Sequence, residues 1–344
     1  MAALGDFTLL RPETAAEAVR WRAQHPGSRF LAGGTDLLPN MRRGLITTEV
    51  VIDLSGVTEL GEVREEEGAL HLGAGLTLAH LAAHPTVQTR LAALAQAAAS
   101  VAGPSHRTSA TLGGNLCLDT RCRFYNQSEA WRTANDFCMK LGSDTCRVAV
   151  KSSRCFAAFS GDVAPALIAL AAEVELLSPR GLRRMPIAEF YRDDGMVWLA
   201  LTPDELLVGV RVPLTEGWVS AYEKVRIRGS IDFPLAGVAV ALRREGDLIG
   251  GLRIALTGVS SRPEYIDLES LLGKPLDAAA LTFIERQVTR GTKAMETSLV
   301  DVPYRRRVTP ILAKGLVRRL WGQTEPEKHL FGPQDGGQGF PGLF

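Results

Sequence analysis

The 344-residue chain has no long hydrophobic run and no marked excess of charge of one sign. Nowhere do about 18 apolar residues follow one another, so we expect no membrane-spanning helix. Lys and Arg number 39 against 38 Asp and Glu, which gives no global basic field for nucleic acid or an anionic membrane. The N-terminal segment contains Asp6 and Glu13 and lacks a basic stretch followed by an apolar core. These absences predict a cytoplasmic protein without membrane or nucleic-acid partners.

The usual nucleotide-binding motifs are also absent. Residues 73–78 read GAGLTL and lack the third glycine of G-x-G-x-x-G, and no G-x-x-x-x-G-K-[ST] loop occurs. Two of the chain's glycine pairs have a threonine within two residues, at 33–35 (GGT) and 111–115 (TLGGN). Because glycine allows positive φ and close backbone approach, two such loops could hold a diphosphate from two sides. A Gly-Gly turn between a strand and a helix is also an ordinary connection, so both interpretations stay open.

Cysteine is scarce, with five in the chain, yet four of them lie between residues 122 and 155 and form no C-x-x-C pair. Structural zinc sites usually include a close pair, so the spacing argues against a zinc ribbon without excluding zinc. Disulfides are disfavoured in a reducing compartment. Four thiolates also suit a cubane iron–sulfur cluster, and incidental cysteines in a solvated basic loop are the remaining alternative. The four residues are Cys122, Cys138, Cys146 and Cys155.

The pattern of helices, strands and turns divides the chain into successive units. A capping box at Thr14 and Glu17 predicts a helix to Gln24, and a second helix is expected over 87–101. Strands followed by amphipathic helices predict an α+β unit near the C-terminus. The expected units are 1–56, 57–192 with an insertion at about 118–157, 214–323, and a flexible tail at 324–344 that is rich in Gly and Pro.

Four segments, in order along the chain, resemble one known family. They are FLAGGTDLLPNMRRG (30–44), ATLGGNL (110–116), SGDVAPALIAL (160–170) and YEKVRIRGSIDFPLAGVAVAL (222–242). Together they resemble the FAD-binding subunits of the molybdenum hydroxylases, the family of xanthine dehydrogenase and carbon monoxide dehydrogenase. The resemblance implies an α+β fold, with a two-part FAD domain of the vanillyl alcohol oxidase and MurB (PCMH) type. A C-terminal α+β domain of the CO dehydrogenase flavoprotein type would follow.

The cysteine-rich segment departs from the ordinary members of that family, which pass from the GGN loop to the segment at Ser160 without an insertion. The insertion is similar to that of the 4-hydroxybenzoyl-CoA reductase branch, whose FAD subunit carries an additional [4Fe-4S] cluster. The resemblance therefore implies two cofactors, FAD and a [4Fe-4S] cluster, and no catalytic residue on this chain. The implied cluster ligands are Cys122, Cys138, Cys146 and Cys155.

The resemblance also assigns FAD contacts residue by residue. One loop would hold the diphosphate from one side, the GGN loop from the other, Asp162 would accept from cofactor hydroxyls, and Lys224 and Asp232 would lie near the flavin. Lys224 could instead face solvent in a strand, and Asp232 could cap a turn. The roles of Cys117 and His106 stay open. The implied contacts are Arg29, Phe30, Leu31, Ala32, Gly33, Gly34, Thr35, Asp36, Leu37, Thr111, Gly114, Asn115, Asp162, Lys224 and Asp232.

Partners follow from the same resemblance: a molybdopterin-containing large subunit, a small subunit with two [2Fe-2S] clusters, and a dimer of heterotrimers. Reductive removal of a phenolic hydroxyl needs low-potential electrons, which favours reduced ferredoxin as the donor. Residues 121–155 hold seven basic and three acidic residues, a net of +4 that could attract an acidic ferredoxin. Arg132, Lys140 and Lys151 are the expected outward-facing members. The alternatives are an oxidative molybdenum hydroxylase of an aromatic or N-heterocyclic substrate, a stand-alone flavoprotein oxidase, and a zinc-bearing structural module.

Overall fold

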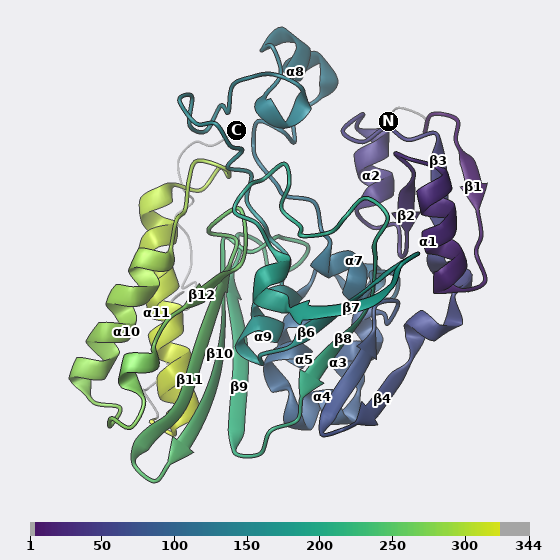
Figure 1. The fold of residues 1–344 in the computed structure, drawn as a ribbon. Helices are drawn as coiled ribbons and strands as arrows, with labels where there is room; N and C mark the ends of the chain where they lie inside the picture. Colours follow the sequence, from purple (N-terminus) through teal and green to yellow (C-terminus); the bar gives the residue numbers. More distant parts are fainter. Residues whose placement is uncertain (1–3, 324–344) are drawn as a thin grey trace.

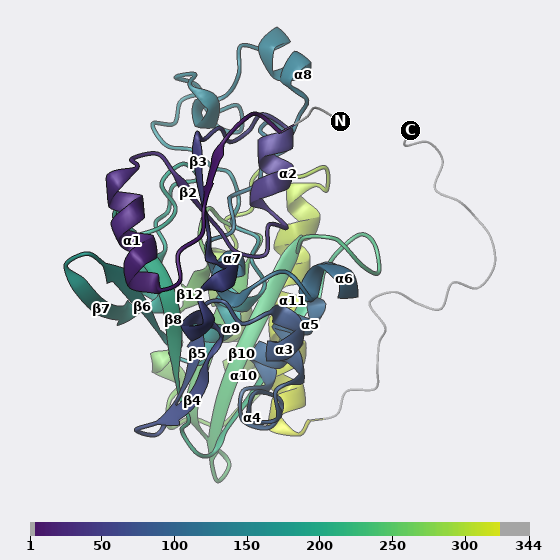
Figure 2. The ribbon, with the colours of Figure 1, turned by 90° about the vertical axis from the view of Figure 1, so that its right-hand side faces the viewer.

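The N-terminal unit of this computed structural model, which describes residues 4–323, is a small parallel sheet with two helices. Its strand order is β1-β3-β2, and Figure 2 shows α1 and α2 beside it. The elements are β1 (Thr8–Leu10), α1 (Ala15–Gln24), β2 (Arg29–Leu31), α2 (Leu37–Arg42) and β3 (Val50–Asp53).

Helix α1 begins where the capping pattern predicts. Thr14 Oγ1 accepts the Glu17 amide at 3.1 Å, while the Glu17 carboxylate accepts the Glu13 amide at 2.9 Å. The buried side chains of Ala18 and Val19 pack in one core cluster with the strand residues of this unit. The predicted helix from Thr14 to Gln24 is therefore confirmed.

The second sheet is antiparallel and has the strand order β4-β5-β8-β6-β7. The sequence pattern placed the end of this unit at residue 192, but the central strand β8 lies beyond that residue. The last segment of the chain that belongs to the sheet therefore ends at Pro213. The division of the chain into domains otherwise stays a prediction. The strands are β4 (Val63–Glu66), β5 (Ala69–Gly73), β6 (Glu173–Ser178), β7 (Gly181–Pro186) and β8 (Leu206–Pro213).

Short helices pack between this sheet and the next. The single helix expected over 87–101 is wrong, because Leu91 leaves helical geometry (φ −127°, ψ 45°) and separates two helices. The break is stabilised by tertiary contacts: Leu91 is buried, and Ser220 Oγ accepts the free Ala93 amide at 3.1 Å. The helices are α3 (Leu78–Ala83), α4 (Pro85–Arg90), α5 (Ala92–Ser100), α6 (Pro104–Arg107), α7 (Leu112–Leu116) and α9 (Val163–Ala169).

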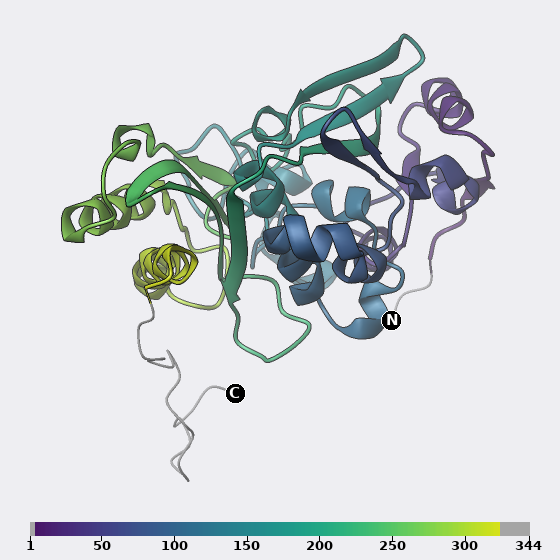
Figure 3. The same ribbon diagram turned by 90° about the horizontal axis from the view of Figure 1, so that it is seen from below.

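The third sheet has the order β12-β11-β10-β9 and lies between two layers of helices (Figures 1 and 3). Helices α10 and α11 pack on one face, and α5 and α9 contact the other. Both faces are therefore apolar, which explains the nearly continuous hydrophobic run of β10. The elements are β9 (Trp218–Val225), β10 (Ala236–Glu245), β11 (Leu248–Thr257), β12 (Glu264–Ile266), α10 (Ala278–Gly291) and α11 (Val302–Trp321).

The cysteine-rich insertion projects from the body as a loop that contains α8 (Glu129–Ala134), at the top of Figure 1. Arg121 and Ala158 exchange two backbone hydrogen bonds of 2.7 Å each and close its base. We refer to this closed base as the neck of the insertion. The tail expected at 324–344 lies outside the described residues. Between residues 4 and 323, no helix combines the length and apolar character needed to cross a membrane.

Candidate functional site

The two glycine loops meet in space. Gly33 follows β2 and packs directly on the segment before the GGN loop: a Cβ built at Gly33 would lie 2.5 Å from the Ser109 carbonyl carbon and 3.0 Å from the Ala110 nitrogen. Both atoms are backbone atoms, so no side-chain rotation could relieve the overlap. Gly34 adopts φ +70°, which glycine reaches without strain. The loops therefore approach closely only because position 33 has no side chain.

Polar side chains of the GGN loop are used to hold the loop itself. Thr111 Oγ1 accepts the Gly114 amide at 3.1 Å, and Asn115 Oδ1 accepts the Val163 amide at 3.2 Å, which ties α7 to α9. Gly114 is exposed, whereas Thr111 and Asn115 are buried. The structure thus gives Thr111 and Asn115 positioning roles and leaves the backbone around Gly114 open to a ligand.

Asp162 and Lys224 form a buried pair. Lys224 Nζ lies 2.9 Å from Asp162 Oδ1, and Tyr222 donates its hydroxyl to the same carboxylate at 2.6 Å. Burial raises the pKa of Asp162 and lowers the pKa of Lys224, and their mutual attraction opposes both effects. The structure therefore brings together two residues that were predicted separately, and excludes a solvent-facing Lys224. Tyr222 was missed, although the strand period of two places it on the same face as Lys224.

Asp232 lies in the loop between β9 and β10 and pairs mainly with Arg228. Its carboxylate accepts the Arg228 amide at 2.6 Å and the Arg228 Nε at 2.7 Å, and this hydrogen bonding by Arg228 lowers the pKa of Asp232. Lys224 Nζ donates to the Asp232 carbonyl at 3.2 Å. The side chain thus serves the turn, while its backbone joins the Asp162–Lys224 pair.

The remaining residues at and around the first glycine loop (residues 29–37) differ in solvent accessibility. Arg29 and Thr35 are exposed, and the others are half-buried. Asp36 is bound by Arg121 from the neck of the insertion and by Asn40 of α2. The Arg121 Nε is buried without a hydrogen-bond partner among the described residues. The half-buried residues are Phe30, Leu31, Ala32, Gly33, Gly34, Asp36 and Leu37.

These features fit a bound dinucleotide. Two glycine-rich backbone segments lie against each other, and beside one of them the Nε of Arg121 is a buried donor without a partner among the described residues, although its Nη atoms pair with Asp36 and Asn40. A phosphate accepts hydrogen bonds from converging backbone N–H groups of such segments. The residues that would hold the diphosphate are those around Gly33, Gly34 and Gly114.

The four cysteines of the insertion are all buried at its base, within electrostatic range of one another. Cys122, Cys138 and Cys155 belong to one apolar cluster, and Cys146 interacts with all three. All five cysteines of the chain are free, so the alternative of disulfides finds no support. Four thiols are the number of ligands that a [4Fe-4S] cluster needs, and the cluster itself stays a prediction.

Backbone amides surround these sulfurs. The amides of Phe124 and Tyr125 approach Cys122, and the Ala157 amide donates to Cys155 Sγ at 3.4 Å. Burial raises the pKa of the Cys155 thiol to about 12, while the Ala157 amide and Lys140 act in the opposite sense. N–H donors to sulfur stabilise thiolates and tune iron–sulfur clusters. The side chains are nevertheless not arranged as a ligand set: residues 4–323 contain no group of three or more His, Cys, Asp or Glu that could hold a metal ion.

Cys117 and His106 lie apart from this cluster. Burial raises the pKa of Cys117 to about 12, next to Tyr191, whose hydroxyl donates to the Leu116 carbonyl at 3.0 Å. His106 is exposed in α6. Neither residue gains a functional partner in the described part of the chain.

Two cations of the insertion face inward, which corrects the expectation that they face outward. Arg132 is 2% exposed and donates to the Gln127 and Arg43 carbonyls at 3.3 and 3.0 Å. The Lys140 ammonium lies 2.6 Å from Asp119 Oδ1 and close to the rings of Tyr125 and Trp198. Tertiary packing sets the inward orientation of both side chains, because each finds its hydrogen-bond acceptors outside the short helix in which it lies. Of the three expected outward-facing residues, Lys151 alone is exposed.

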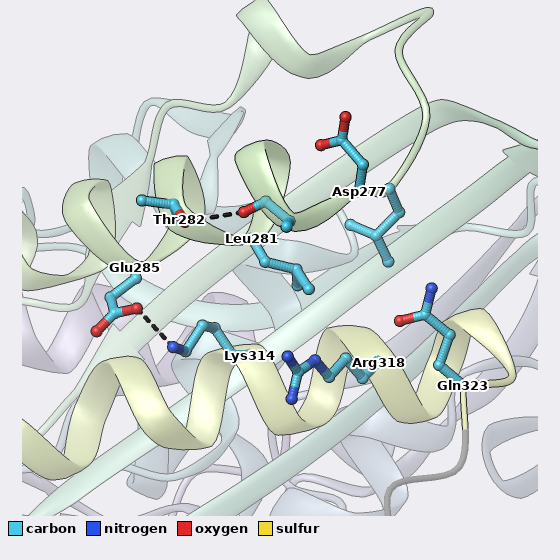
Figure 4. Close-up of a pocket in the computed structure, with 9 residues that line it drawn as sticks. Asp277, Leu281, Thr282, Glu285, Lys314, Arg318 and Gln323 are labelled. Carbon is cyan, nitrogen blue, oxygen red and sulfur yellow. Dashed lines mark hydrogen bonds and ion pairs between the residues drawn. The ribbon is translucent and has the colours of Figure 1, made fainter.

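A surface groove of about 540 Å³ lies elsewhere, between α10 and α11. Figure 4 shows Glu285 and Lys314 pointing toward each other across it, with an ion pair of 2.5 Å. Its lining includes neither a cysteine nor a glycine, and none of the predicted cofactor contacts. The predicted cofactor-binding residues therefore lie away from this groove.

The comparisons with known proteins agree with this geometry. The family described as "FAD binding domain in molybdopterin dehydrogenase" matches residues 5–215. The chain belongs to this family of FAD-binding subunits. It is 35% identical to the aldehyde oxidoreductase FAD-binding subunit PaoB of Escherichia coli, over 76% of this chain and 84% of that protein. It is 28% identical to the carbon monoxide dehydrogenase medium chain of Hydrogenophaga pseudoflava, over 92% of this chain and 98% of that protein.

A solved structure shares the fold. Carbon monoxide dehydrogenase from Hydrogenophaga pseudoflava, in a form that lacks the Mo-pyranopterin moiety of the molybdenum cofactor, matches 94% of this chain and 100% of its own. The TM-score is 0.77 and the identity 27%. The predicted α+β fold of the CO dehydrogenase flavoprotein type is therefore confirmed. The chain is an FAD-binding subunit of a molybdenum hydroxylase-type oxidoreductase, and the glycine loops stay the predicted position of FAD.

Proposed function

We propose that the chain is the FAD- and [4Fe-4S]-carrying electron-transfer subunit of a molybdenum enzyme that acts reductively on 4-hydroxybenzoyl-CoA. The reaction replaces the phenolic hydroxyl by hydrogen: two electrons and two protons enter, and benzoyl-CoA and water leave. Reduced ferredoxin supplies the electrons. The substrate binds on another subunit, so the described residues serve cofactor binding and electron transfer.

The observation that carries this proposal is the buried cysteine cluster at the base of the insertion. Three of the four thiols share one apolar cluster and the fourth, Cys146, is within electrostatic range of them, in a chain whose family is defined by FAD binding. A chain that handles electrons through FAD alone has no need of four buried thiols in an inserted segment. An additional cluster is suited to accept low-potential electrons ahead of FAD.

The two cofactors, when bound, accept and pass on electrons, and the chain provides their surroundings. Cys122, Cys138, Cys146 and Cys155 would hold the cluster once deprotonated, since metal binding to thiols releases protons. The Lys140 ammonium, which pairs with Asp119, also favours the thiolate forms of Cys138 and Cys155. The buried Asp162–Lys224 pair would border the FAD and hold its surroundings in one geometry.

The partners we propose are a molybdopterin-containing large subunit and a small subunit with two [2Fe-2S] clusters, in a dimer of heterotrimers. The names of the relatives support a multisubunit assembly, since they include FAD-binding subunits and medium chains. We place the assembled enzyme in the cytoplasm, where ferredoxin is available.

An oxidative molybdenum hydroxylase is the second candidate function. The relatives' names favour it: they include a nicotinate dehydrogenase FAD-subunit of Eubacterium barkeri and a caffeine dehydrogenase subunit beta of Pseudomonas sp., each 28% identical. In that case the complex would oxidise an aromatic or N-heterocyclic substrate. A stand-alone flavoprotein oxidase has less support. Such an enzyme needs a substrate pocket beside the flavin, and the lining of the groove between α10 and α11 contains no residue of the glycine loops.

Anaerobic purification of the native complex tests the proposal. We expect one FAD and four additional iron atoms and sulfides on this subunit, and dehydroxylation of 4-hydroxybenzoyl-CoA with reduced ferredoxin. Oxidation of N-heterocycles with no activity on the thioester would support the second candidate instead. Zinc in place of iron would overturn the cluster.

Two serine variants provide a matched pair. Cys138→Ser should lose the four-iron cluster, whereas Cys117→Ser should keep full iron content, because Cys117 lies outside the cysteine cluster. Electron paramagnetic resonance of the dithionite-reduced protein and chemical iron analysis measure both. Full iron in Cys138→Ser would remove this residue from the ligand set.

The ferredoxin contact needs exposed cations, and the structure narrows the choice. Lys151 is exposed and Arg147 is half-buried, whereas Arg132 and Lys140 face inward. Charge reversal by Arg147→Glu and Lys151→Glu should slow reduction by ferredoxin several-fold at low salt, with reduction by an uncharged dye unchanged. Lys274→Glu, exposed in the C-terminal unit, is the control. Equal ferredoxin rates in all variants would place the docking surface elsewhere.

A further inference from the structure

Arg121 joins the insertion to the first glycine loop. Its backbone forms the neck with Ala158, and its side chain crosses to α2, where Nη2 pairs with Asp36 and Nη1 donates to Asn40 Oδ1 at 3.0 Å. Asn40 Nδ2 in turn donates to Asp36 Oδ2 at 3.2 Å, so the three side chains form a closed ring. The Arg121 side chain is 12% exposed.

Within the described part of the chain, the Asp36 side chain pairs with Arg121 and Asn40 alone. It stands before α2 but makes no capping hydrogen bond with its side chain, so its carboxylate is available to the insertion. The same carboxylate belongs to the segment that we expect to hold the FAD diphosphate. An unpaired carboxylate there would repel the phosphates, because like charges at short range disfavour each other in a partly buried site.

We infer that Arg121 is a positioning residue for FAD: its guanidinium neutralises the charge of Asp36, so that the first glycine loop can bind a diphosphate without charge repulsion. The inference rests on the proposed position of FAD at the two glycine loops. It makes the neck of the insertion part of the FAD site. FAD binding and the folding of the insertion are then coupled through one ion pair, and such coupling is reciprocal.

A second contact supports the same role. The Arg121 guanidinium lies over the ring of Phe233, 5.4 Å from its centroid, in the loop between β9 and β10 that contains Asp232. One side chain from the neck of the insertion therefore contacts both the segment of the first glycine loop and the loop expected to border the flavin. Replacement of Arg121 by a neutral residue leaves Asp36 charged and removes the contact with Phe233.

Affinity for FAD in the full-length protein, after FAD removal, tests the inference by fluorescence titration. Arg121→Met should bind FAD about tenfold more weakly, a size typical of coupled sites. The double variant Asp36→Asn with Arg121→Met should regain at least half of the lost affinity on a logarithmic scale, because the repelling charge is gone. A merely structural role for Arg121 would give no such rescue.

The outcomes separate the inference from the proposed FAD site. Suppose that Gly33→Ala weakens FAD binding. The inference is then overturned if Arg121→Met binds FAD with unchanged affinity, or if the double variant regains less than half of the affinity lost in Arg121→Met. If neither Gly33→Ala nor Arg121→Met affects affinity, the proposed FAD position itself is wrong and the inference falls with it. Should Arg121→Met not fold, Arg121→Lys replaces it: retained charge should keep affinity within about threefold of the wild type, and a tenfold loss would overturn the neutralising role.

Discussion

Gly33→Ala is the smallest change that should separate the two glycine loops. The added Cβ would overlap the Ser109 carbonyl oxygen and lie 2.5 Å from its carbon, whereas ordinary contacts lie at 3.4 Å or beyond, so the backbone must move by at least about 1 Å. Over-packing of this kind costs about 1–3 kcal/mol. If that cost falls on the arrangement that binds FAD, affinity should fall roughly five- to 150-fold.

The assay is fluorescence titration of FAD-depleted full-length protein at 25 °C, together with urea denaturation of the same samples. Gly61→Ala is the matched control, since a Cβ there meets nothing within 4 Å and the residue is exposed. We expect its affinity to equal that of the wild type. An affinity of Gly33→Ala within twofold of the wild type would refute the proposed contact between the loops as a requirement for FAD binding.

Three further predictions concern stability. Lys140→Met should destabilise the protein by about 3–5 kcal/mol in urea denaturation, because Asp119 is left as an uncompensated buried charge. Arg183→Met should lower Tm, at a cost of about 1 kcal/mol, because Arg183 hydrogen-bonds Glu205 at 2.5 and 2.8 Å and lowers the pKa of that carboxyl. The folded pKa lies below 4.5, so the Tm difference from wild type should be full above pH 4.5 and shrink as the pH falls below it. Gly315→Ala should raise stability by about 0.5–1 kcal/mol, since the site lies within α11 and a Cβ there meets nothing.

Each of these has an outcome that contradicts it. Lys151→Met is the control for Lys140→Met: because Lys151 is exposed, its replacement should change the free energy of unfolding by less than about 0.5 kcal/mol. If Lys140→Met lowered the free energy of unfolding no more than Lys151→Met does, the buried Lys140–Asp119 pair would not stabilise the protein. A Tm difference for Arg183→Met that persists unchanged in acid would exclude the ion pair as its cause. A lower Tm for Gly315→Ala would mean that the helix is crowded at that point.

Local sequence signals predicted local structure well. The capping box at Thr14 predicted the start of α1, and the helix ends at Gln24 as expected. These features depend on neighbours within a few residues, where propensity and periodicity act directly. The helix expected over 87–101 failed because the acceptor of the Ala93 amide is Ser220, far along the chain.

The resemblance of four segments, in order along the chain, to a known family predicted the fold class and the FAD-binding character, and the sequence itself showed a cysteine-rich insertion. The tertiary structure alone decided which charges meet. Arg121 pairs with Asp36, 85 positions away, and Lys224 pairs with Asp162 inside the core. It also turned Arg132 and Lys140 inward, although both lie in a basic segment that the sequence pattern predicted to face solvent. The physical reason is that burial of a charge is tolerated only where distant segments supply its partners, and no local pattern encodes those partners.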